Sequence, residues 1–302
     1  MFQCPLCQTP KMDIRDTGAY CPKCAASFDR LSGYLVFITG SARDAFLSRQ
    51  LMEWYSEEQV RIGARLFHDY LRPVIGLRDG ERVLDVGCGV GCNVQAMRQA
   101  GYEAYGIDLP NHLEAWRQTS APPDAFFCAD GCALPFCDNV FDTVMSFGVV
   151  EHIGSTTGGG VLREDYWDAR RAYARELVRV CRPGGRILVA CPNLRFPIDI
   201  QHPPPEGGWL RKKLFAATSI NLHWPMGRYH LLSFGQIKRL FCHDAGASDC
   251  SALPLRGYFG FSRMRKGVLG MMRSVAAAYV NNLPKMFRPT ALNPYVCVMI
   301  RK

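Results

Sequence analysis

The chain has 302 residues, of which 48% are hydrophobic and 21% are charged. This composition excludes a disordered or fibrous chain, and the length allows one large domain with a small additional module. The first residues lack the charged-then-apolar order of a signal peptide, and no stretch reaches the roughly 18 apolar residues of a membrane span. We therefore expect a soluble cytoplasmic protein.

The net charge of +9 is concentrated toward the C-terminus. Residues 207–302 contain 15 Lys or Arg residues against only Asp244 and Asp249. Such a basic C-terminal third predicts an anionic partner. Three kinds of partner fit: a phosphorylated small molecule, a membrane surface contacted peripherally, or a nucleic acid.

Four of the 14 cysteines have the spacing of metal ligands. Cys4 and Cys7 form one C-x2-C pair, and Cys21 and Cys24 form a second pair after 13 intervening residues. Each pair can turn two thiolates toward one ion, and two pairs complete a tetrahedral site. We predict Zn²⁺ in a ribbon at residues 1–40, with iron in a rubredoxin-like site as the alternative. The other cysteines lie mostly in apolar runs and are interpreted as small core residues.

A module of about forty residues buries too little apolar surface to fold unaided, so the metal would supply its stability. The run from Cys21 to Ile38 resembles the zinc ribbons of the Trm112-like type that precede some methyltransferase domains. A similar ribbon heads certain ribosomal RNA guanine methyltransferases. That second resemblance keeps RNA open as a substrate.

Residues 41–79 are predicted to form one or two helices that link the ribbon to the next domain. Ser41 followed by Asp44 is typical of a helix N-cap with an acidic third position. Apolar residues then recur at helical spacing, at Leu47, Leu51, Tyr55, Leu66, Tyr70 and Val74. These helices either cover a binding site or simply pack on the domain.

The segment RVLDVGCGVG, from Arg82 to Gly91, predicts a buried strand that breaks into a glycine turn. A helix is expected next, at Asn93–Ala100. A glycine turn at the carboxyl end of a strand lets a ligand approach the backbone closely. The pattern is not the dinucleotide motif G-x-G-x-x-G, because the sixth position counted from Gly87 is Cys92.

VLDVGCGVG resembles the first motif of class I S-adenosylmethionine (SAM)-dependent methyltransferases, and further pieces of UbiE/UbiG-like motifs follow in order over residues 80–192. The resemblance implies an α/β fold over residues 80–302, with a doubly wound, mostly parallel, seven-stranded Rossmann-like sheet. It also implies that SAM is bound by the residues of this first motif, Asp85, Gly87, Gly89 and Gly91.

Two further strands are expected to end in acids. The second strand, Ala104–Asp108, ends in a carboxylate that can accept hydrogen bonds from both ribose hydroxyls, and Leu109 follows it. The third, Ala125–Asp130, ends in an acid that by resemblance accepts from the adenine amino group, while Gly131 and Cys132 line the adenine pocket. A single acid after a strand is often only a cap or turn residue. Acids at three successive strand ends favour SAM binding.

The fourth strand, Val140–Phe147, should end beside the sulfonium of SAM, which makes Phe147 a further cofactor residue. The resemblance places the following loop opposite the substrate, so Glu151 and His152 are the candidate catalytic residues. An imidazole near its normal pKa can remove a hydroxyl proton near neutral pH, although positioning or packing is the alternative role. A helix at Tyr166–Val180, a turn at Arg182–Gly185 and a fifth strand at Arg186–Pro192 should follow.

Residues 193–232 interrupt the alternation of strands and helices with five prolines, several aromatic residues and three histidines. An insertion over the carboxyl edge of the sheet would exclude water and position an acceptor, so we interpret it as a substrate lid. The side chains proposed to reach the substrate are His202, His223, Trp224, Tyr229 and His230.

The remaining chain should close the sheet. We expect a helix from Ser233 to about Ala245, and closing elements at Ala252–Phe259 and Pro294–Ile300 with an antiparallel edge. The intervening Arg263–Arg288 mixes basic and apolar residues. It is interpreted either as an amphipathic helix for an anionic membrane or lipid-like substrate, or as a helix packed on the protein.

The leading functional hypothesis is a SAM-dependent methyltransferase acting on a small acceptor that is anionic, with a phosphate or diphosphate, or lipid-like. The first alternative is an RNA methyltransferase of the rRNA type, whose ribbon and basic C-terminal third would bind phosphates. The N-P-P-[FYW]-type motif of many base amino-group methylases is missing where Ser146-Phe-Gly-Val stands, which disfavours that subclass alone. The second alternative is a non-catalytic SAM-binding partner subunit.

Overall fold

The computed structural model divides into two compact units. It describes residues 1–47, 59–60, 63–156, 161–199, 201–204, 208–218, 220–259 and 268–302. Unit 1 comprises Met1–Ser146, Glu176–Ile187 and Lys302, whereas unit 2 comprises Phe147–Arg175 and Leu188–Arg301. Helix α5 (Tyr166–Val180) and strand β9 (Cys181–Pro192) each continue from one unit into the other.

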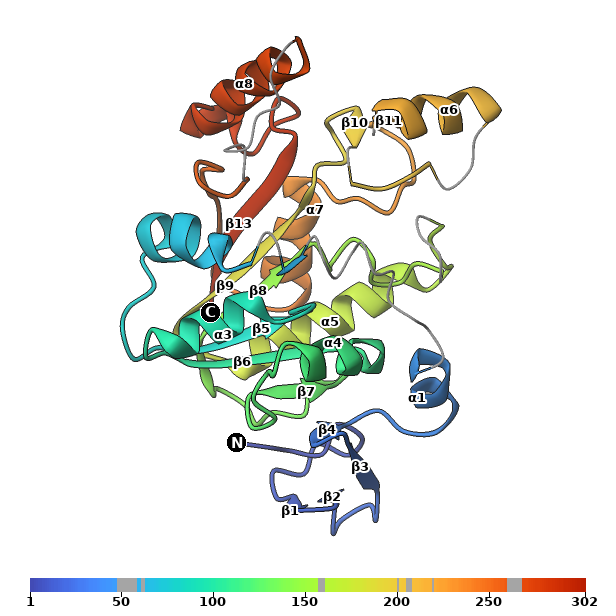
Figure 1. Cartoon of the computed structure of the whole chain (residues 1–302), viewed down its shortest axis with the longest axis vertical. Coiled ribbons are helices and arrows are strands. Elements are labelled where there is room, and N and C mark those ends of the chain that lie inside the picture. Colours follow the sequence, from blue (N-terminus) through green and yellow to red (C-terminus); the bar gives the residue numbers. More distant parts are fainter. Residues whose placement is uncertain are drawn as a thin grey trace. The chain divides into compact units, whose positions relative to one another are not determined.

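Unit 1 is built on a parallel sheet. Its central strands are β5 (Arg82–Val86), β6 (Glu103–Asp108), β7 (Phe126–Cys128), β8 (Phe141–Phe147) and the first half of β9. They lie in the order β7-β6-β5-β8-β9, and β5 pairs in parallel with both β6 and β8 (Figure 1). Parallel neighbours need a crossover, which α3 (Cys92–Gln99) provides between β5 and β6 and α4 (Leu113–Gln118) provides between β6 and β7.

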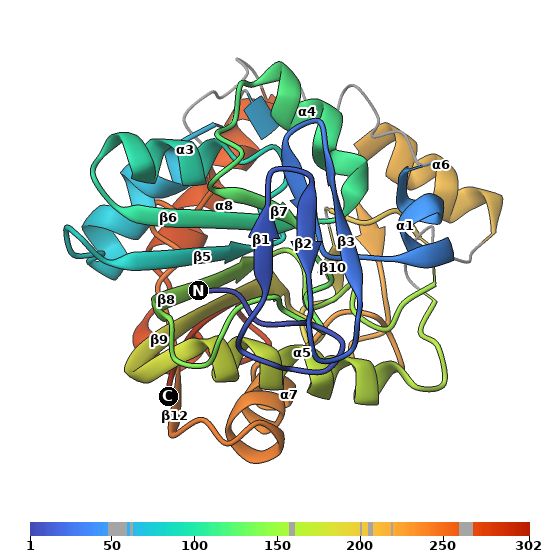
Figure 2. The same ribbon diagram turned by 90° about the horizontal axis from the view of Figure 1, so that it is seen from below.

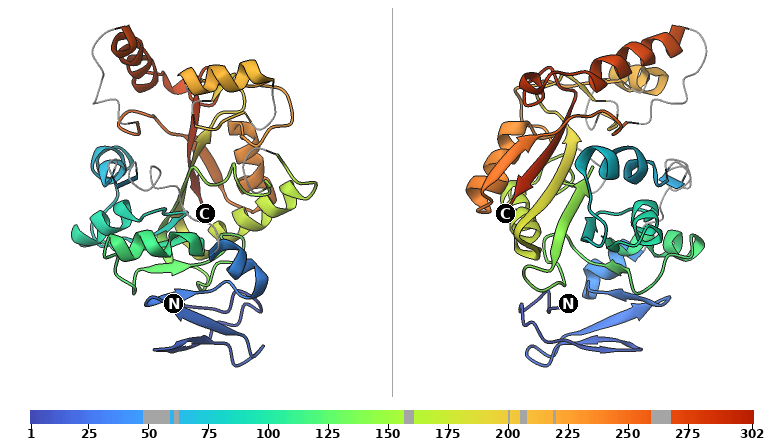
Figure 3. Two further views of the ribbon diagram at one scale, coloured as in Figure 1. Left: turned by 45° about the vertical axis from the view of Figure 1, so that its right-hand side comes forward. Right: turned by 90° about the vertical axis from the view of Figure 1, so that its left-hand side faces the viewer.

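In unit 2, the second half of β9 is followed in the sheet by β13 (Tyr295–Arg301) and then by β12 (Asp249–Ala252). Strands β12 and β13 are antiparallel, and the right-hand view of Figure 3 shows β13 lying along β9. The orders β7-β6-β5-β8-β9 and β9-β13-β12 together contain the seven strands expected from the sequence. The predicted doubly wound α/β class with an antiparallel edge is therefore confirmed.

Strand β9 begins at Cys181, earlier than the expected Arg186. The sequence indicated a turn at the Pro-Gly-Gly that follows α5. Instead, Gly184 N–H donates to the carbonyl of Lys302 and Lys302 N–H donates to the carbonyl of Gly185. Because the C-terminal residue supplies this pairing, the chain stays extended there.

The strand expected at Ala252–Phe259 was misplaced, because β12 already ends at Ala252. Pro254 has no N–H to donate to a ladder, and Gly257 has a φ of 86°, outside the extended region. The strand lies instead in the residues just before the predicted stretch.

The N-terminal ribbon adds its own strands to the edge of the sheet. These are β1 (Asp13–Arg15), β2 (Gly18–Tyr20), β3 (Ser27–Leu31) and β4 (Tyr34–Val36), of which β1, β2 and β3 stand out in Figure 2. Strand β4 pairs in parallel with β7, with Leu35 opposite Phe127 and Val36 opposite Cys128. The sequence indicated a small appended module, whereas the structure makes the ribbon a continuation of the sheet of unit 1.

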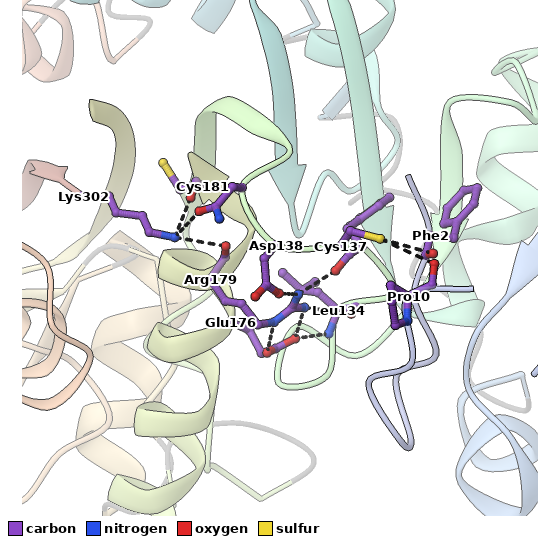
Figure 4. Close-up of polar contacts among 11 residues, drawn as sticks. Phe2, Pro10, Leu134, Cys137, Asp138, Glu176, Arg179, Cys181 and Lys302 are labelled. Atoms are coloured by element: carbon purple, nitrogen blue, oxygen red, sulfur yellow. Dashed lines mark hydrogen bonds and ion pairs between the residues drawn. The ribbon is translucent and has the colours of Figure 1, made fainter. Parts of the chain in front are cut away.

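The first residues of the chain are also packed into unit 1. The Phe2 ring lies among three other rings, with centroid distances of 5.4 Å to Phe37, 5.1 Å to Phe127 and 5.7 Å to Phe136. Cys137 Sγ lies 3.4 Å from the carbonyl oxygen of Phe2, as Figure 4 shows. Unfolding of the ribbon would therefore expose part of the core of unit 1.

Beside these contacts, Arg179 connects α5 to the loop after β7. Its guanidinium donates to Glu176 Oε1 at 2.7 Å, to Asp138 Oδ1 at 2.8 Å and to the carbonyl of Leu134 at 3.1 Å (Figure 4). Glu176 in turn accepts from the N–H of Leu134 at 2.7 Å. This network fixes the loop on which the N-terminus packs.

The linker is only partly described. Helix α1 (Gly40–Leu47) begins before Ser41, so Ser41 lies within the helix and is not its N-cap. The π-helical segment η1 (Leu66–Ile75) buries the predicted Tyr70 and ends at Gly76, whose φ is 71°. The predicted Leu51 and Tyr55 lie outside the described residues.

Unit 2 also contains the insertion at 193–232. Here β10 (Ile198–Asp199) pairs antiparallel with β11 (Asn221–Leu222), and helix α6 (Trp209–Thr218) lies between them in sequence. Further along come α7 (Phe234–Lys238), η3 (Arg239–Asp244), α8 (Val268–Asn281) and η4 (Lys285–Phe287). Ser233, at which the expected helix begins, caps α7 through a capping box with Gln236.

Among the described residues, no helix combines the length and the hydropathy that crossing a bilayer requires.

Candidate functional site

The four cysteines of the ribbon converge on one point. Cys4 Sγ lies 3.6 Å from Cys24 Sγ, Cys7 Sγ lies 3.5 Å from Cys21 Sγ, and all four sulfurs lie within 4.8 Å of one another. Four thiolates at about 2.3 Å from a tetrahedral Zn²⁺ would stand about 3.8 Å apart. The sulfur positions therefore fit a four-thiolate site with no open ligand position.

Both cysteine pairs sit in loops of the same geometry. The N–H of Cys4 donates to the carbonyl of Thr9, and the N–H of Cys21 donates to the carbonyl of Ala26, each at 2.9 Å. The residue after each second cysteine is left-handed, with φ of 56° at Gln8 and 57° at Ala25. Two matched knuckles facing one centre are typical of a structural metal site.

The loop after β5 is shaped by three glycines. Gly87, Gly89 and Gly91 have φ values of 84°, 56° and 82°, which non-glycine residues rarely adopt. A Cβ at Gly91 would lie 2.2 Å from Cε1 of Phe126. The φ values favour glycine at all three positions, and at Gly91 the ring of Phe126 leaves no room for a side chain.

Asp108, at the end of β6, holds this glycine loop. Its Oδ2 accepts from the N–H of Gly89 at 2.7 Å, its Oδ1 accepts from the N–H of Leu109 at 2.8 Å, and His112 Nδ1 lies 3.1 Å from Oδ1. Burial alone would raise the pKa of Asp108, but His112 and the two N–H groups outweigh it and the pKa is lowered. Asp108 is therefore an ionised carboxylate whose two oxygens together keep acceptor sites for ribose hydroxyls.

Two further side chains clamp the same loop. Trp116 Nε1 donates to the carbonyl of Gly89 at 2.7 Å, and Gln59 Oε1 accepts from the N–H of Val90 at 2.9 Å. The left-handed glycine loop is thus fixed on three sides by Asp108, Trp116 and Gln59. Such support holds a binding loop in one conformation before a ligand arrives.

The other strand-end acids differ in environment. Asp85 is only 6% exposed, and burial followed by the charge of Asp108 raises its pKa to about 7. Asp130 is exposed, and its Oδ1 accepts from the N–H of Cys132 at 2.8 Å, while Gly131 and Cys132 are half-buried. The structure thus places the three acids of unit 1 at neighbouring strand ends, as predicted, with Asp85 buried, Asp108 half-buried and Asp130 exposed.

Phe147, the last residue of β8, belongs to unit 2. Its ring packs edge-on against Tyr258, with a centroid distance of 5.8 Å. Tyr258 in turn packs against Tyr295 of β13. The contact of Phe147 with SAM remains a prediction.

The candidate catalytic and substrate residues of unit 2 largely form one cluster. His202 Nε2 lies 3.4 Å from His152 Nε2, and the rings of His202 and His230 have a centroid distance of 4.7 Å. Ligand atoms of Glu151, His152 and His202 lie within 4.8 Å of one another, and those of Asp199, His202 and His230 do so as well. The insertion therefore brings its histidines to the loop after β8, within the same unit.

Burial dominates the electrostatics of this cluster. It raises the pKa of Glu151 to about 7 and, with help from the charge of His202, lowers the pKa of His152 to about 4 and of His230 to about 3. For His202, the charge and hydrogen bond of Asp199 outweigh burial and raise the pKa. His152 is thus neutral at pH 7 and a weaker base than the unperturbed imidazole that the sequence suggested.

The remaining candidates lie at the margin of the cluster or outside it. The His223 ring stacks on Tyr229 at a centroid distance of 4.8 Å, and Tyr229 packs against His230 at 4.3 Å. Trp224 is 74% exposed and does not join the cluster. The predicted substrate contacts of Trp224, Tyr229 and His223 remain predictions.

Residues 84–189 match the family model described as a methyltransferase domain. This range contains the glycine loop, the three strand-end acids and the Glu151–His152 pair. The chain carries a class I SAM-dependent methyltransferase domain.

The relatives of the methyltransferase domain are methyltransferases named for different acceptors. Over 127 residues the chain is 32% identical to a demethylmenaquinone methyltransferase of Corynebacterium urealyticum, a match that covers 42% of this chain and 48% of the relative. It is 32% identical over 123 residues to a 2-methyl-6-phytyl-1,4-hydroquinone methyltransferase of Synechocystis, covering 39% and 34%. The chain thus spans about half the length or less of these curated relatives.

Solved structures of similar fold include a Haemonchus contortus phosphoethanolamine N-methyltransferase 2 bound to SAM. It is 16% identical, the match covers 87% of this chain and 59% of that chain, and the TM-score is 0.47. The assignment of the methyltransferase domain rests on the family match and the sequence relatives.

Sequence reasoning missed several residues that shape the domain. Gln59 and Trp116 belong to no recognisable sequence motif, because their roles depend on contacts with the glycine loop after β5, which is distant from both in sequence. His112 and Asp199 carried a weak signal, because each stands close to its partner in sequence, four residues after Asp108 and three before His202.

Proposed function

We propose that this protein transfers the methyl group of SAM to a small acceptor with an apolar body and an anionic or ionisable oxygen. The observation that carries the proposal is the fixed glycine loop of unit 1 with acids at the ends of β5, β6 and β7. SAM supplies the electrophilic methyl group when bound. Everything else in the reaction is binding, alignment and proton handling by the chain itself.

Unit 1 supplies the SAM-binding residues of this proposal. Asp108 would accept from the ribose hydroxyls, with Leu109 beside the ribose. Asp130, Gly131 and Cys132 would form the adenine site. The backbone of the glycine loop at Gly87–Gly91 would approach the amino-acid end of SAM. These assignments follow the strand-end positions, and the contacts of Asp108 support them.

Unit 2 supplies the groups proposed to act on the acceptor. Glu151 and His152 follow the end of β8, and His202 and His230 join them from the insertion, with Tyr229 and His223 next to them. A cluster of carboxylate and imidazole groups, in which Glu151 and His230 are buried, can orient a hydroxyl and hold its proton. This arrangement supports an acceptor that reacts through oxygen or through a carbon activated by a neighbouring hydroxyl.

The character of the surface of unit 2 supports an apolar, anionic acceptor. Helix α6 contains no buried residue among those described, and it presents Trp209 and Leu210, 68% and 67% exposed, next to Arg211, Lys212 and Lys213. Figure 3 shows α6 and α8 at the same end of unit 2. Exposed apolar residues among cations suit a lipid-like molecule with a phosphate or diphosphate. The two relatives described above, named for demethylmenaquinone and for a phytyl hydroquinone, are consistent with an apolar body.

The deciding experiment offers labelled SAM to the purified chain with three acceptor pools: total RNA, prenyl and lipid phosphates, and quinols. We expect label in a small molecule. Label in RNA would replace the proposal with the RNA methyltransferase, for which the ribbon and the basic C-terminal third are the motivation. SAM binding without transfer to any pool would favour the non-catalytic partner subunit.

SAM binding should strengthen as the pH rises toward 7. Asp85 has a pKa of about 7 in the folded chain, so it is largely protonated below that pH, and cationic SAM prefers the carboxylate. If SAM binds only the ionised form, affinity should fall up to about tenfold per pH unit below 7 and level off above it, since one pKa unit corresponds to about 1.4 kcal/mol. Calorimetry across pH 5–8 measures this, and Asp85→Asn should flatten the profile. An equally steep profile in the Asn variant would remove Asp85 from the site.

A further inference from the structure

We infer that Glu151, His152 and His202 bind a divalent transition-metal ion, separate from the four-cysteine site of the ribbon. Two imidazoles and one carboxylate offer ligand atoms within 4.8 Å of one another. Two-His, one-carboxylate sets hold catalytic zinc and non-haem iron, and they leave coordination positions open for a ligand. The inference concerns metal binding by unit 2 and does not depend on methyl transfer.

The separation of the two imidazole nitrogens matches a shared ion. Nε2 of His152 and Nε2 of His202 are 3.4 Å apart. Ligand nitrogens at about 2.0–2.1 Å from a tetrahedral Zn²⁺ stand about 3.3–3.4 Å from each other. The two nitrogens thus already have the spacing that two tetrahedral ligands require.

Asp199 sets the tautomer that a metal ligand needs. His202 Nδ1 lies 2.9 Å from Asp199 Oδ2, and Asp199 is only 1% exposed. Because that carboxylate accepts from Nδ1–H, the lone pair of His202 is on Nε2, which faces His152. A carboxylate behind a ligating imidazole is the usual outer partner of a metal-bound histidine.

The side chain of Glu151 gives the strongest indication that the cluster binds a cation. Its side chain is fully buried, and among the described residues neither carboxylate oxygen has a hydrogen-bond partner. Within the same part of the chain, both ring nitrogens of His230, 1% exposed, also lack one, and His230 lies beside His202. A buried carboxylate left without a partner is costly, and a cation at the cluster would satisfy it.

The backbone that carries these side chains is held in place by a buried arginine. Arg170, 1% exposed, donates to the carbonyls of Glu151, Ile153 and His230. Asn221 Nδ2 donates to the carbonyl of His202 at 3.0 Å, which ties the segment that carries His202 to β11 within the insertion. Ligands from two distant segments are therefore fixed relative to each other, as a site for a geometrically demanding ion requires.

An ion held by three protein ligands would have open positions for an acceptor oxygen. Its charge would stabilise a hydroxyl in the deprotonated form. This consequence rests on the proposed function, whereas metal binding does not.

The test is metal stoichiometry of tag-free, full-length protein in equilibrium dialysis against Zn²⁺, with neither SAM nor acceptor present. We expect two equivalents in the wild-type chain, one at the cysteines and one at the cluster. His202→Ala and the isosteric Glu151→Gln should each bind one. Asp199→Asn should weaken the second equivalent about 10- to 100-fold, the usual effect of removing an outer partner.

The matched control is His243→Ala, because the His243 side chain is 83% exposed and lies outside the cluster; it should retain both equivalents. Replacing Zn²⁺ by Co²⁺ separates the sites, since only the cysteine site gives thiolate-to-metal charge-transfer absorption. A wild-type chain that binds one equivalent, or a Glu151→Gln variant that still binds two, would overturn the inference. If the wild-type chain binds two equivalents of Zn²⁺ but does not bind SAM in a separate titration, the proposed function is refuted and the metal site stands.

Discussion

Cys4→Ser should lose the ribbon metal and destabilise the whole of unit 1, not only its first forty residues. Cys4 is buried and contributes one of four thiolates to the site. Structural zinc contributes about 10–16 kcal/mol in isolated zinc-finger peptides, and removal of one ligand abolishes much of it. Substitutions that remove a structural metal are among the few that lower the free energy of unfolding by more than about 4 kcal/mol.

The effect should spread because the ribbon is part of the sheet. Strand β4 pairs with β7, and Phe2 packs against Phe37, Phe127 and Phe136 in the core. If the knuckles open, β7 becomes an edge strand and the loop that carries Asp130 loses its support. We therefore expect SAM affinity to fall together with stability, although the ribbon itself supplies no proposed SAM contact.

The measurements are the zinc-to-protein ratio, urea unfolding and SAM calorimetry on the same preparation. Cys92→Ser is the matched control, because Cys92 is a half-buried cysteine of unit 1 outside the metal cluster. That variant should keep its zinc. An unchanged zinc ratio in Cys4→Ser would refute the four-thiolate site, and an intact unit 1 after zinc loss would show that β4–β7 pairing is not essential.

The accuracy of the sequence interpretation followed how local each feature is. Strands β5, β6 and β8 begin within one residue of their predicted positions, because a run of apolar residues and the following glycine or acid lie together in the chain. The helix at Tyr166–Val180 was predicted with the observed bounds. The four thiolates were recognisable from spacing alone.

Features that depend on distant partners were not predictable. Pairing of β4 with β7 joins residues 35 and 127, and no local pattern specifies it. Likewise, His152, His202 and His230 were each candidates, but only the β10–β11 pairing and Arg170 bring them to one point. The low pKa of His152 also follows from burial, which the sequence does not report.

Asp108→Ala should weaken SAM binding by about 100-fold or more and also lower stability. Each hydrogen bond to a charged group contributes about 1.5–3 kcal/mol, and two ribose hydroxyls are proposed to use this carboxylate. The sequence alone, which shows Asp108 only as an acid at a strand end, predicts an intact fold in this variant. The structure argues otherwise, because Asp108 also holds the N–H groups of Gly89 and Leu109 and faces buried His112.

The two roles of Asp108 separate in a second variant. Breaking a buried ionic contact by removing one partner costs about 3–5 kcal/mol, so Asp108→Ala in the absence of SAM should unfold at distinctly lower urea concentration. Asp108→Asn keeps one acceptor oxygen for Gly89 and should retain more stability, yet it cannot accept from both ribose hydroxyls and should still bind SAM poorly. Asp124→Ala, at an exposed acid that pairs with Arg98, is the control and should change neither quantity by much. If Asp108→Ala loses stability but binds SAM with wild-type affinity, then Asp108 is a structural clamp of the glycine loop, and the ribose contacts belong to another residue.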